Sequence, residues 1–433
     1  MKHTKSILVA ALAVAAIGSA SAAVTNNVPR NQFNIAGSTA LRGVTMPTIY
    51  NYAVDQGYSL QCADATLVGT IGNNPKVALF SKEISRVTNS KTGDVNVTKD
   101  YINVHMIGSE GGTLVTGSKN VQGFAPLNAV SITEAGCTNS NSATITFSDV
   151  DQAAGNFTGA KGAWAKVAKL TEVGQIAAIN FCFVASSNFP VSNITAQQAK
   201  ALYSAGYLPL SFFTGNTNDL TNGVFATGRD IDSGTRVTTF AEIGLGASAA
   251  VQQYAYNSGS NVVSLTPAGT LNGVSYAAGM GGENSGGTLC TLIATSGSQN
   301  LTAANVTACP TNITGKVYLI GYTSSADAGT KTLKVLSYNG FAPYYTSATS
   351  NGFQNGTNGI PTGQYSFWST GRLLYNVANA PKGTDKTLIP TLASGIYSNL
   401  TNKTTANFGS GYTALSDMKV QRAIEGAKIT PKN

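Results

Sequence analysis

The segment from Arg229 to Thr235 combines residue types that can bind a small anion. Its sequence, Arg-Asp-Ile-Asp-Ser-Gly-Thr, places a guanidinium shortly before Ser233, a residue well suited to cap a helix. Apolar residues then recur at helical spacing from Val237 to Phe240 and beyond. A helix N-terminus offers unpaired N–H groups and roughly half a unit of positive charge, and an arginine adds a bidentate grip on an oxyanion. Because serine also caps helices that bind nothing, this segment alone leaves both interpretations open.

Three other segments end a predicted strand with small polar residues. Gln32–Ala36 alternates like a strand and leads into Gly37-Ser-Thr-Ala-Leu-Arg-Gly43, with a helical stripe behind it. Tyr101–Ile107 leads into Gly108-Ser-Glu-Gly-Gly112, and a third strand ends in Ser148-Asp149. In open α/β sheets, ligands bind at the carboxyl ends of the strands. These loops are therefore candidates for one shared site.

The rest of the chain continues the alternation of strands and helices. Gln175–Val184 is almost continuously apolar, as expected of a strand covered on both faces, and Ile194–Gln198 is a capping box whose helix should stop at Gly206. Lys316–Tyr322 is a further predicted central strand. Residues 279–308 and 348–363 are rich in Gly, Ser, Thr and Asn and are predicted to be long surface loops. The pattern indicates the α/β class.

The first residues predict export. Lys2 and Lys5 precede the apolar run Ile7–Ile17, and Ala20–Ala22 provides a cleavage site of the A-x-A type. This predicts a signal peptide over residues 1–22 and a mature chain that begins near Ala23. No Cys lies at the cleavage point, so we expect no lipid anchor, and no later segment is apolar for long enough to enter a membrane. A periplasmic or secreted protein is therefore predicted.

Length, charge and composition narrow the class of protein. The 433-residue chain is longer than one core normally serves, so two lobes are expected. Without Lys2 and Lys5 the formal charge falls from +8 to +6, and the basic residues are scattered, which argues against nucleic acid as a partner. Only 11% of the residues are charged, so the surface must consist largely of hydroxyl and amide groups.

The cysteine and histidine residues do not indicate a metal site or a histidine-based catalytic site. Cys290–Cys309 and Cys62–Cys137 are predicted disulfides in an exported chain, whereas Cys182 lies in an apolar run and is predicted to be a buried free thiol. No cysteine has metal-ligand spacing, and no cofactor is expected. His105 lies in a predicted strand and is interpreted as structural.

Taken in order, the motifs resemble those of the phosphate-binding protein family of bacterial ABC importers. The similar segments are Gly37-Ser-Thr-Ala40, Gly108-Ser-Glu-Gly-Gly112, Ser148-Asp149, the strand and helix over 176–205, the Arg-x-x-x-Ser-Gly-Thr segment that begins at Arg229, and Ile320-Gly-Tyr322. The resemblance covers most of residues 30–380.

The resemblance implies a two-lobed fold of the periplasmic-binding-protein type, in which each lobe has a central, mostly parallel sheet flanked by helices, with long polar loop insertions. We expect one lobe to comprise residues 23–155 and 316–433 and the other residues 156–315, with the Gly/Ser-rich excursion at about 279–308. It further implies a non-enzymatic protein that captures inorganic phosphate between the lobes, with an ABC permease as partner. Two other roles remain open: a structural or surface protein that reuses the fold, and a secreted phosphatase.

Carried across residue by residue, the resemblance also implies a phosphate-binding set. Thr39 and Ala40 would offer backbone N–H groups, with the Thr39 hydroxyl. The remaining contacts would come from Ser109, Asp149, Arg229, Ser233, Gly234 and Thr235.

Two features depart from the family pattern or complicate it. The family often has Asp two positions after the Arg, where this chain has Ile231 between Asp230 and Asp232, so the Arg must be held by other groups or by a displaced Asp. Glu110 would bring negative charge close to the anion, and we expect it to point to solvent.

Overall fold

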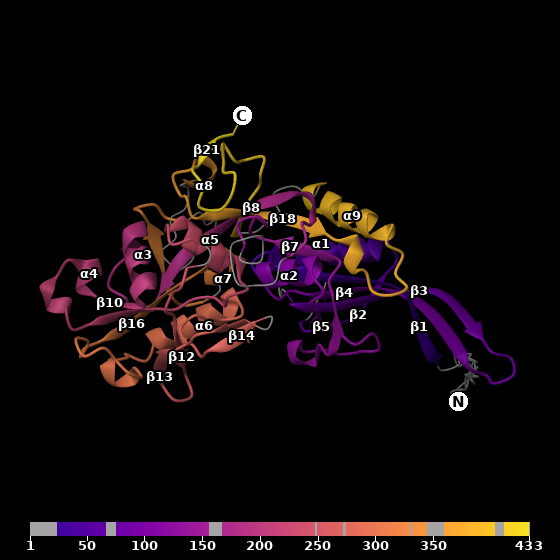
Figure 1. Ribbon diagram of the computed structural model, residues 1–433, viewed down its shortest axis with the longest axis horizontal. Helices are drawn as coiled ribbons and strands as arrows, with labels where there is room; N and C mark the ends of the chain where they lie inside the picture. The colour runs from indigo at the N-terminus through magenta and orange to yellow at the C-terminus, as the bar shows by residue number, and fades with distance from the viewer. Residues whose placement is uncertain are drawn as a thin grey trace, which may run out of the picture.

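The computed structural model describes the chain from Val24 to Lys432 with several gaps. The described ranges are 24–65, 75–155, 167–246, 249–271, 274–329, 331–343, 359–402 and 411–432. The predicted signal peptide and most of the predicted loop at 348–363 lie outside these ranges. Figure 1 shows an elongated molecule, with β1, β3 and β4 at one end and α3 and α4 at the other.

Thirteen described strands form one sheet that runs through the molecule. Its main path, in spatial order, is β10 (Tyr207–Pro209), β11 (Gly223–Ala226), β16 (Val317–Ser324), β8 (Thr171–Ala185), β18 (Trp368–Tyr375), β7 (Ile145–Ser148), β1 (Val24–Gly37), β4 (Val95–His105), β3 (Val77–Thr88) and β2 (Ser59–Ala63). Joined to it off this path are β9 (Asn193–Ile194), β17 (Lys334–Tyr338) and β19 (Tyr412–Thr413).

The α/β class is confirmed, with a mixed sheet. Parallel ladders join β1 to both β4 and β7, and join β11 to β16. Antiparallel ladders join β8 to β16 and to β18, so the long strand β8 links the two groups of parallel strands. Residues 176–185 of β8 are all buried, as the continuous apolar run predicted.

Helices flank this sheet in both halves of the molecule (Figure 1). Helices α1 (Arg42–Asp55), α2 (Ser109–Gly117) and α9 (Leu388–Asn402) lie in the half that contains β1, and α1 packs beside α9. Helices α3 (Ala196–Ala205), α5 (Gly234–Glu242) and α6 (Gly286–Gly297) lie in the half that contains β11. The short helices are α4 (Ser211–Thr214), α7 (Ser325–Ala328) and α8 (Gly359–Thr362).

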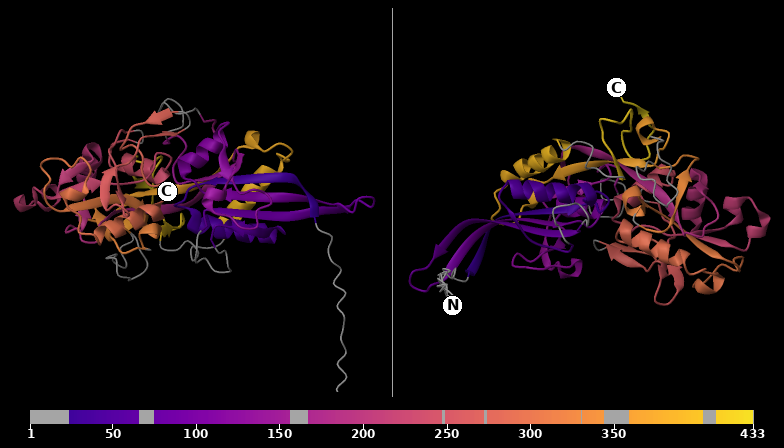
Figure 2. Two further views of the ribbon diagram at one scale, coloured as in Figure 1. Left: turned by 90° about the horizontal axis from the view of Figure 1, so that it is seen from below. Right: turned by 180° about the vertical axis from the view of Figure 1, so that it is seen from behind.

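Four small two-stranded antiparallel sheets also occur in the described structure. They are formed by β5 (Gln122–Phe124) with β6 (Asn139–Asn141), β12 (Tyr254–Asn257) with β13 (Val262–Leu265), β14 (Gly269–Leu271) with β15 (Val274–Tyr276), and β20 (Val420–Gln421) with β21 (Thr430–Pro431). The two further views show that the outer parts of β1, β3 and β4 project beyond the rest of the molecule (Figure 2).

The capping box predicted before α3 is confirmed. The Thr195 hydroxyl accepts a hydrogen bond from the Gln198 amide at 3.2 Å, and the Gln198 side chain accepts one from the Thr195 amide at 2.9 Å. The helix ends at Gly206, whose φ of 82° suits a residue without a Cβ.

The prediction of a surface loop over 279–308 is wrong for its central part, which forms α6. Ser285 caps this helix by accepting a hydrogen bond from the Thr288 amide at 3.1 Å. Leu289, Cys290 and Ile293 share one buried face. The low helix propensity of Gly and Thr hid this short apolar stripe, whose burial against β16 outweighs the propensity cost.

The expected division into lobes at residues 155 and 315 remains a prediction. That division assigns β16 to the first lobe, whereas the two strands that pair with it, β11 and β8, belong to the second.

Both predicted disulfides are absent, because all five cysteines are free thiols. Cys290 lies on the buried face of α6 in a cluster with Cys182, whereas Cys309 packs against a different cluster, which includes Val263 of β13. Cys62 and Cys137 belong to the same cluster but are not bonded to each other. Cys182 is a buried free thiol, as predicted.

Gly112 allows α2 to pack closely against the ends of β1 and β7. A Cβ at this position would lie 2.5 Å from the Thr146 hydroxyl oxygen and 2.6 Å from the Gly37 Cα atom. We predict that Gly112→Ala lowers the free energy of unfolding by roughly 1–3 kcal/mol, because backbone atoms must move to relieve the overlap. Denaturant titration followed by circular dichroism measures this loss.

Gly287→Ala in α6 is the matched control, since the nearest atoms to its added Cβ lie 3.8 Å away. It should be neutral or raise stability by up to about 1 kcal/mol through helix propensity. Equal effects of the two substitutions would contradict the close packing of α2.

Candidate functional site

Four segments that are distant in sequence meet at one place. The turn after β1 brings Thr39 and Ala40, the start of α2 brings Ser109, the end of β7 brings Asp149, and the segment between β11 and the first turn of α5 brings Arg229, Ser233, Gly234 and Thr235. We call Thr39, Ser109, Asp149, Arg229 and Thr235 the Arg229 cluster. Each of these five side chains belongs to a residue that is at most 4% exposed.

The parallel strands explain this meeting. Strands β4, β1 and β7 are parallel neighbours, so their carboxyl ends lie at one edge of the sheet. The segments that follow these ends carry Ser109, Thr39 and Asp149. In the other half, β11 delivers Arg229 in the same way.

Asp149 is the acceptor at the centre of the cluster. Its Oδ1 atom accepts a hydrogen bond from the Ser109 hydroxyl, and its Oδ2 atom accepts one from the Thr235 hydroxyl at 3.4 Å. The Asp149 amide donates back to the Ser109 hydroxyl oxygen at 2.9 Å. A Cβ on Gly234 would lie only 1.8 Å from Asp149 Oδ1, so glycine is required there. The arrangement holds the carboxyl group in one orientation.

Burial raises the pKa of the Asp149 carboxyl above its ordinary value. The hydrogen bond from Ser109 and the positive charge of Arg229 oppose this rise without cancelling it. The group therefore holds a proton more readily than an exposed aspartate does.

Arg229 is held by backbone oxygen atoms and a hydroxyl. Its Nε donates to the Glu283 carbonyl at 3.0 Å, and its Nη2 donates to the Asn284 carbonyl at 3.1 Å and to the Thr39 hydroxyl oxygen at 3.3 Å. The sequence has Ile231 where the family often has an Asp that could support the arginine. Carbonyl groups, rather than a displaced aspartate, orient the guanidinium here. Because carbonyls carry no full charge, the arginine keeps its capacity to attract an anion.

Asp232 connects the two halves of the molecule next to the cluster. Its backbone carbonyl accepts hydrogen bonds from the amides of Glu110 at 3.0 Å and Gly111 at 3.3 Å, both in the first turn of α2. Burial and the neighbouring Asp230 raise the pKa of Asp232 to about 7. The start of α2 is thus tied to the segment that carries Arg229.

Ser233 caps α5, as the sequence suggested, because its hydroxyl accepts a hydrogen bond from the Arg236 amide at 3.4 Å. In the turn before α1, the amides of Ala40 and Leu41 donate to the Ser38 hydroxyl oxygen at 3.1 and 3.3 Å. The Ala40 amide, predicted as an anion donor, is therefore already paired with Ser38.

The prediction that Glu110 points to solvent is wrong, since this residue is only 1% exposed. Its carboxylate lies against Gly155, where an added Cβ would be 2.4 Å from Oε1. The first turn of α2 is covered by the segment after β7, which sequence spacing did not reveal.

Sequence reasoning also missed the support behind Arg229. The Gln253 amide nitrogen donates to the Arg229 carbonyl at 3.1 Å, and Gln253 Oε1 accepts from the Tyr322 hydroxyl at 2.8 Å. Tyr322 in turn accepts from the Arg229 amide at 3.2 Å, and Arg236 Nη1 donates to the Arg229 carbonyl at 3.1 Å. Of these supporting residues, only Tyr322 belonged to a motif identified in the sequence, the Ile-Gly-Tyr segment of a predicted strand.

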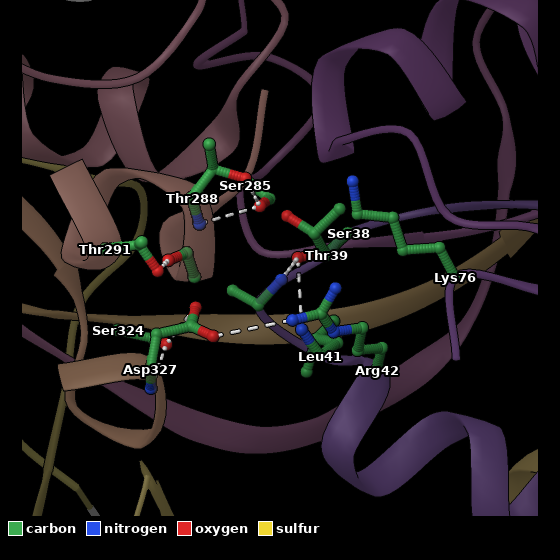
Figure 3. A network of polar contacts seen from close by, with 12 residues as sticks. Ser38, Thr39, Leu41, Arg42, Lys76, Ser285, Thr288, Thr291, Ser324 and Asp327 are labelled. Atoms are coloured by element: carbon green, nitrogen blue, oxygen red, sulfur yellow. Dashed lines mark hydrogen bonds and ion pairs between the residues drawn. The ribbon is translucent and has the colours of Figure 1, made fainter. Parts of the chain in front are cut away.

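A cavity of about 800 Å³ adjoins the cluster at Thr39 and Ala40. We call it the α6 cavity, because Thr288 and Thr291 of α6 line one side. Figure 3 shows these side chains around the same region as Thr39, together with Arg42 and Asp327.

His105 has a structural environment. Its Nδ1 atom lies 2.6 Å from the Gly123 carbonyl oxygen, and the residue is 7% exposed. Burial lowers its pKa, but hydrogen bonds with Cys137, Glu134 and that carbonyl outweigh burial and raise the pKa to about 9.

The described residues contain no group of three or more His, Cys, Asp or Glu residues able to hold a metal ion. None of the helices in the described ranges has the length and apolar character needed to cross a membrane.

Comparison with known proteins found similarity to solved structures only, since no family model and no curated protein matches. A putative phosphate ABC transporter substrate-binding protein with bound phosphate from Clostridium perfringens is 14% identical, with a TM-score of 0.41 over 89% of this chain and 100% of that one. An ABC-type phosphate transport receptor from Vibrio cholerae is 13% identical, with a TM-score of 0.36 over 84% and 93%. PstS from Borrelia burgdorferi is 13% identical, with a TM-score of 0.33 over 87% and 95%.

The raised pKa of Asp149 predicts a pH-dependent stability difference. The folded carboxyl binds its proton more tightly than the unfolded chain does, so ionisation opposes folding and stability falls as pH rises through the folded pKa. Asp149→Asn removes this titration. We therefore expect the thermal midpoint of the Asp149→Asn variant, measured by calorimetry relative to that of the parent protein, to be higher at pH 8 than at pH 5.

Asp55→Asn, at the exposed end of α1, serves as the control and should follow the parent across this range. A difference between Asp149→Asn and the parent that stays constant with pH would show that the Asp149 carboxyl is not perturbed.

Proposed function

We propose that this protein is a non-catalytic binding protein that captures inorganic phosphate at the Arg229 cluster. The observation that carries the proposal is the meeting of one guanidinium, three hydroxyl groups and one carboxyl group from four separate segments. We further propose that it acts outside the cytoplasmic membrane and delivers phosphate to an ABC permease.

The donors suit a tetrahedral oxyanion. Arg229 provides charge-assisted hydrogen bonds, and the starts of α2 and α5 add helix dipoles that favour negative charge. In the ligand-free arrangement the Ser109 and Thr235 hydroxyls donate to Asp149 instead. A bound phosphate takes over these donors, and closure of the site around it would report occupancy to a permease.

Asp149 gives the site its selectivity for phosphate over sulfate. An ionised carboxylate only accepts hydrogen bonds, and phosphate at neutral pH still carries a proton to donate to it, whereas sulfate carries none. For sulfate, the missing hydrogen bond to the Asp149 carboxylate costs roughly 1–3 kcal/mol of binding free energy. Repulsion between the two negative charges adds to this cost. Since about 1.4 kcal/mol corresponds to a tenfold change in affinity, sulfate should bind much more weakly.

The first test concerns this selectivity. Calorimetric titration of dialysed protein at pH 8, where Asp149 is most fully ionised, should show phosphate binding and at least tenfold weaker sulfate binding. Asp149→Asn replaces an acceptor oxygen with a donor amide, so it should narrow the difference between the two anions. Absence of phosphate binding by the parent protein would remove the proposal, and unchanged selectivity in the variant would remove the role of Asp149.

The second test concerns Arg229. Lysine keeps the charge but cannot contact two carbonyls, Thr39 and an oxyanion through one planar group. Arg229→Lys should therefore weaken phosphate binding at least tenfold, which is about 1.4 kcal/mol. Circular dichroism checks that the variant is folded, because the side chain also fastens the Glu283–Asn284 backbone.

Arg30→Lys is the matched control for this test. Arg30 also makes paired contacts with oxygen atoms, those of Asp100, but it lies within β1 and outside the Arg229 cluster. Its substitution should leave phosphate affinity within twofold of the parent. Normal binding by Arg229→Lys would mean that phosphate binds elsewhere.

A further inference from the structure

The α6 cavity is much larger than a phosphate ion needs. Its volume of about 800 Å³ falls within the range of roughly 300–1,000 Å³ typical of sites for small organic molecules. Its walls come from the turn after β1, one face of α6, the short helix α7, the end of β12 and Tyr412. A ligand held at the Arg229 cluster would have this space beside it.

Direct contacts connect the cavity wall to the cluster. Thr39, which lines the cavity, accepts a hydrogen bond from Arg229 Nη2, and Glu283, which also lines it, accepts one from Arg229 Nε through its carbonyl. The guanidinium is therefore bonded to two residues of the wall. An oxyanion bound by Arg229 would therefore lie next to the part of the wall formed by Thr39 and Glu283.

The charged residues of the cavity wall balance one another. Two cationic residues, Arg42 and Lys331, are matched by two acidic ones, Asp327 and Glu283. Arg42 Nη2 lies 3.5 Å from Asp327 Oδ1, and both side chains are about 15% exposed. A wall with no excess of either sign favours an uncharged guest with both donor and acceptor groups, in contrast to the cationic Arg229.

Hydroxyl groups supply most of the other polar atoms of the wall. They belong to Thr39, Ser258, Ser285, Thr288, Thr291, Thr295, Ser324, Tyr256 and Tyr412. The Thr291 hydroxyl donates to the Gly287 carbonyl at 3.0 Å, and its oxygen can still accept a hydrogen bond. Such groups match the hydroxyls of a polyol.

We propose that the protein binds phosphate monoesters of polyhydroxylated alcohols in addition to inorganic phosphate. The phosphoryl group occupies the Arg229 cluster, and the organic part occupies the α6 cavity. This inference rests on the proposed function, since it assigns the cluster to a phosphoryl group.

The cluster also accommodates the different protonation of an ester. A phosphate monoester loses its last proton with a pKa of about 6, so at neutral pH it has mostly no proton to donate to Asp149. A hydrogen bond between the two is more easily formed when the ester itself keeps that proton. Ester binding should therefore be strongest at mildly acidic pH, where a larger share of the ester is protonated.

The test compares inorganic phosphate, glycerol 3-phosphate and glucose 6-phosphate by calorimetry at pH 6, with glucose alone as a further ligand. Both esters should bind, and glucose should not. Thr291→Trp fills the cavity from the exposed side of α6 and should weaken binding of glucose 6-phosphate at least tenfold while phosphate affinity stays within twofold. Ser298→Trp, at the exposed end of the same helix and outside the cavity wall, should change neither affinity.

The outcomes separate this inference from the proposed function. Phosphate binding without ester binding overturns the inference and leaves the proposed function intact. Ester binding that Thr291→Trp does not weaken also overturns it, because the organic part then lies outside the cavity. Failure of all phosphorylated ligands to bind removes both.

Discussion

The burial of one arginine and one aspartate in the same cluster is the constraint on which the site depends. Arg229 and Asp149 are each at most 2% exposed, and burying a charge is costly unless polar groups surround it. The structure meets this cost with two carbonyls and a hydroxyl at Arg229 and with two hydroxyls at Asp149. Neither charge is neutralised by the other in a direct pair, so both remain available to a guest that carries negative charge and a proton.

Sheet topology makes this cluster possible. Parallel pairing of β4, β1 and β7 brings three loops to one edge, and the long strand β8 joins that group to β16 and β11 in the other half. The contact between Arg229 and Thr39 crosses from one half to the other, as does the contact between Thr235 and Asp149. The site is therefore made by the two halves together, and any relative movement between them must change it.

The sequence predicted the parts of this arrangement that depend on local pattern. The capping residues Ser233 and Thr195, the buried strand β8 and the strand-to-loop units all carry short-range signals of period, propensity and hydrogen bonding. Long-range packing had no such signal. Gln253 supports Arg229, Gly155 lies against the Glu110 carboxylate, and α6 forms within a Gly- and Thr-rich stretch. Each depends on contacts with residues far away in the chain. The predicted Cys290–Cys309 disulfide was wrong for the same reason, because α6 directs Cys290 toward Cys182 and away from Cys309.

The position of Thr39 shows how affinity and selectivity are divided between two neighbouring regions. Its hydroxyl contacts Arg229, to which the proposed function assigns the phosphoryl group, and Thr39 also lines the α6 cavity. The cavity, with balanced charges and many hydroxyls, adds little attraction for an anion as such. In the proposed binding mode the cavity acts on the group attached to the anion, because a hydroxyl-rich wall favours a guest that can form hydrogen bonds with it over an apolar one. Under the two proposals, the chain would recognise the phosphoryl group by charge and its substituent by hydrogen bonding.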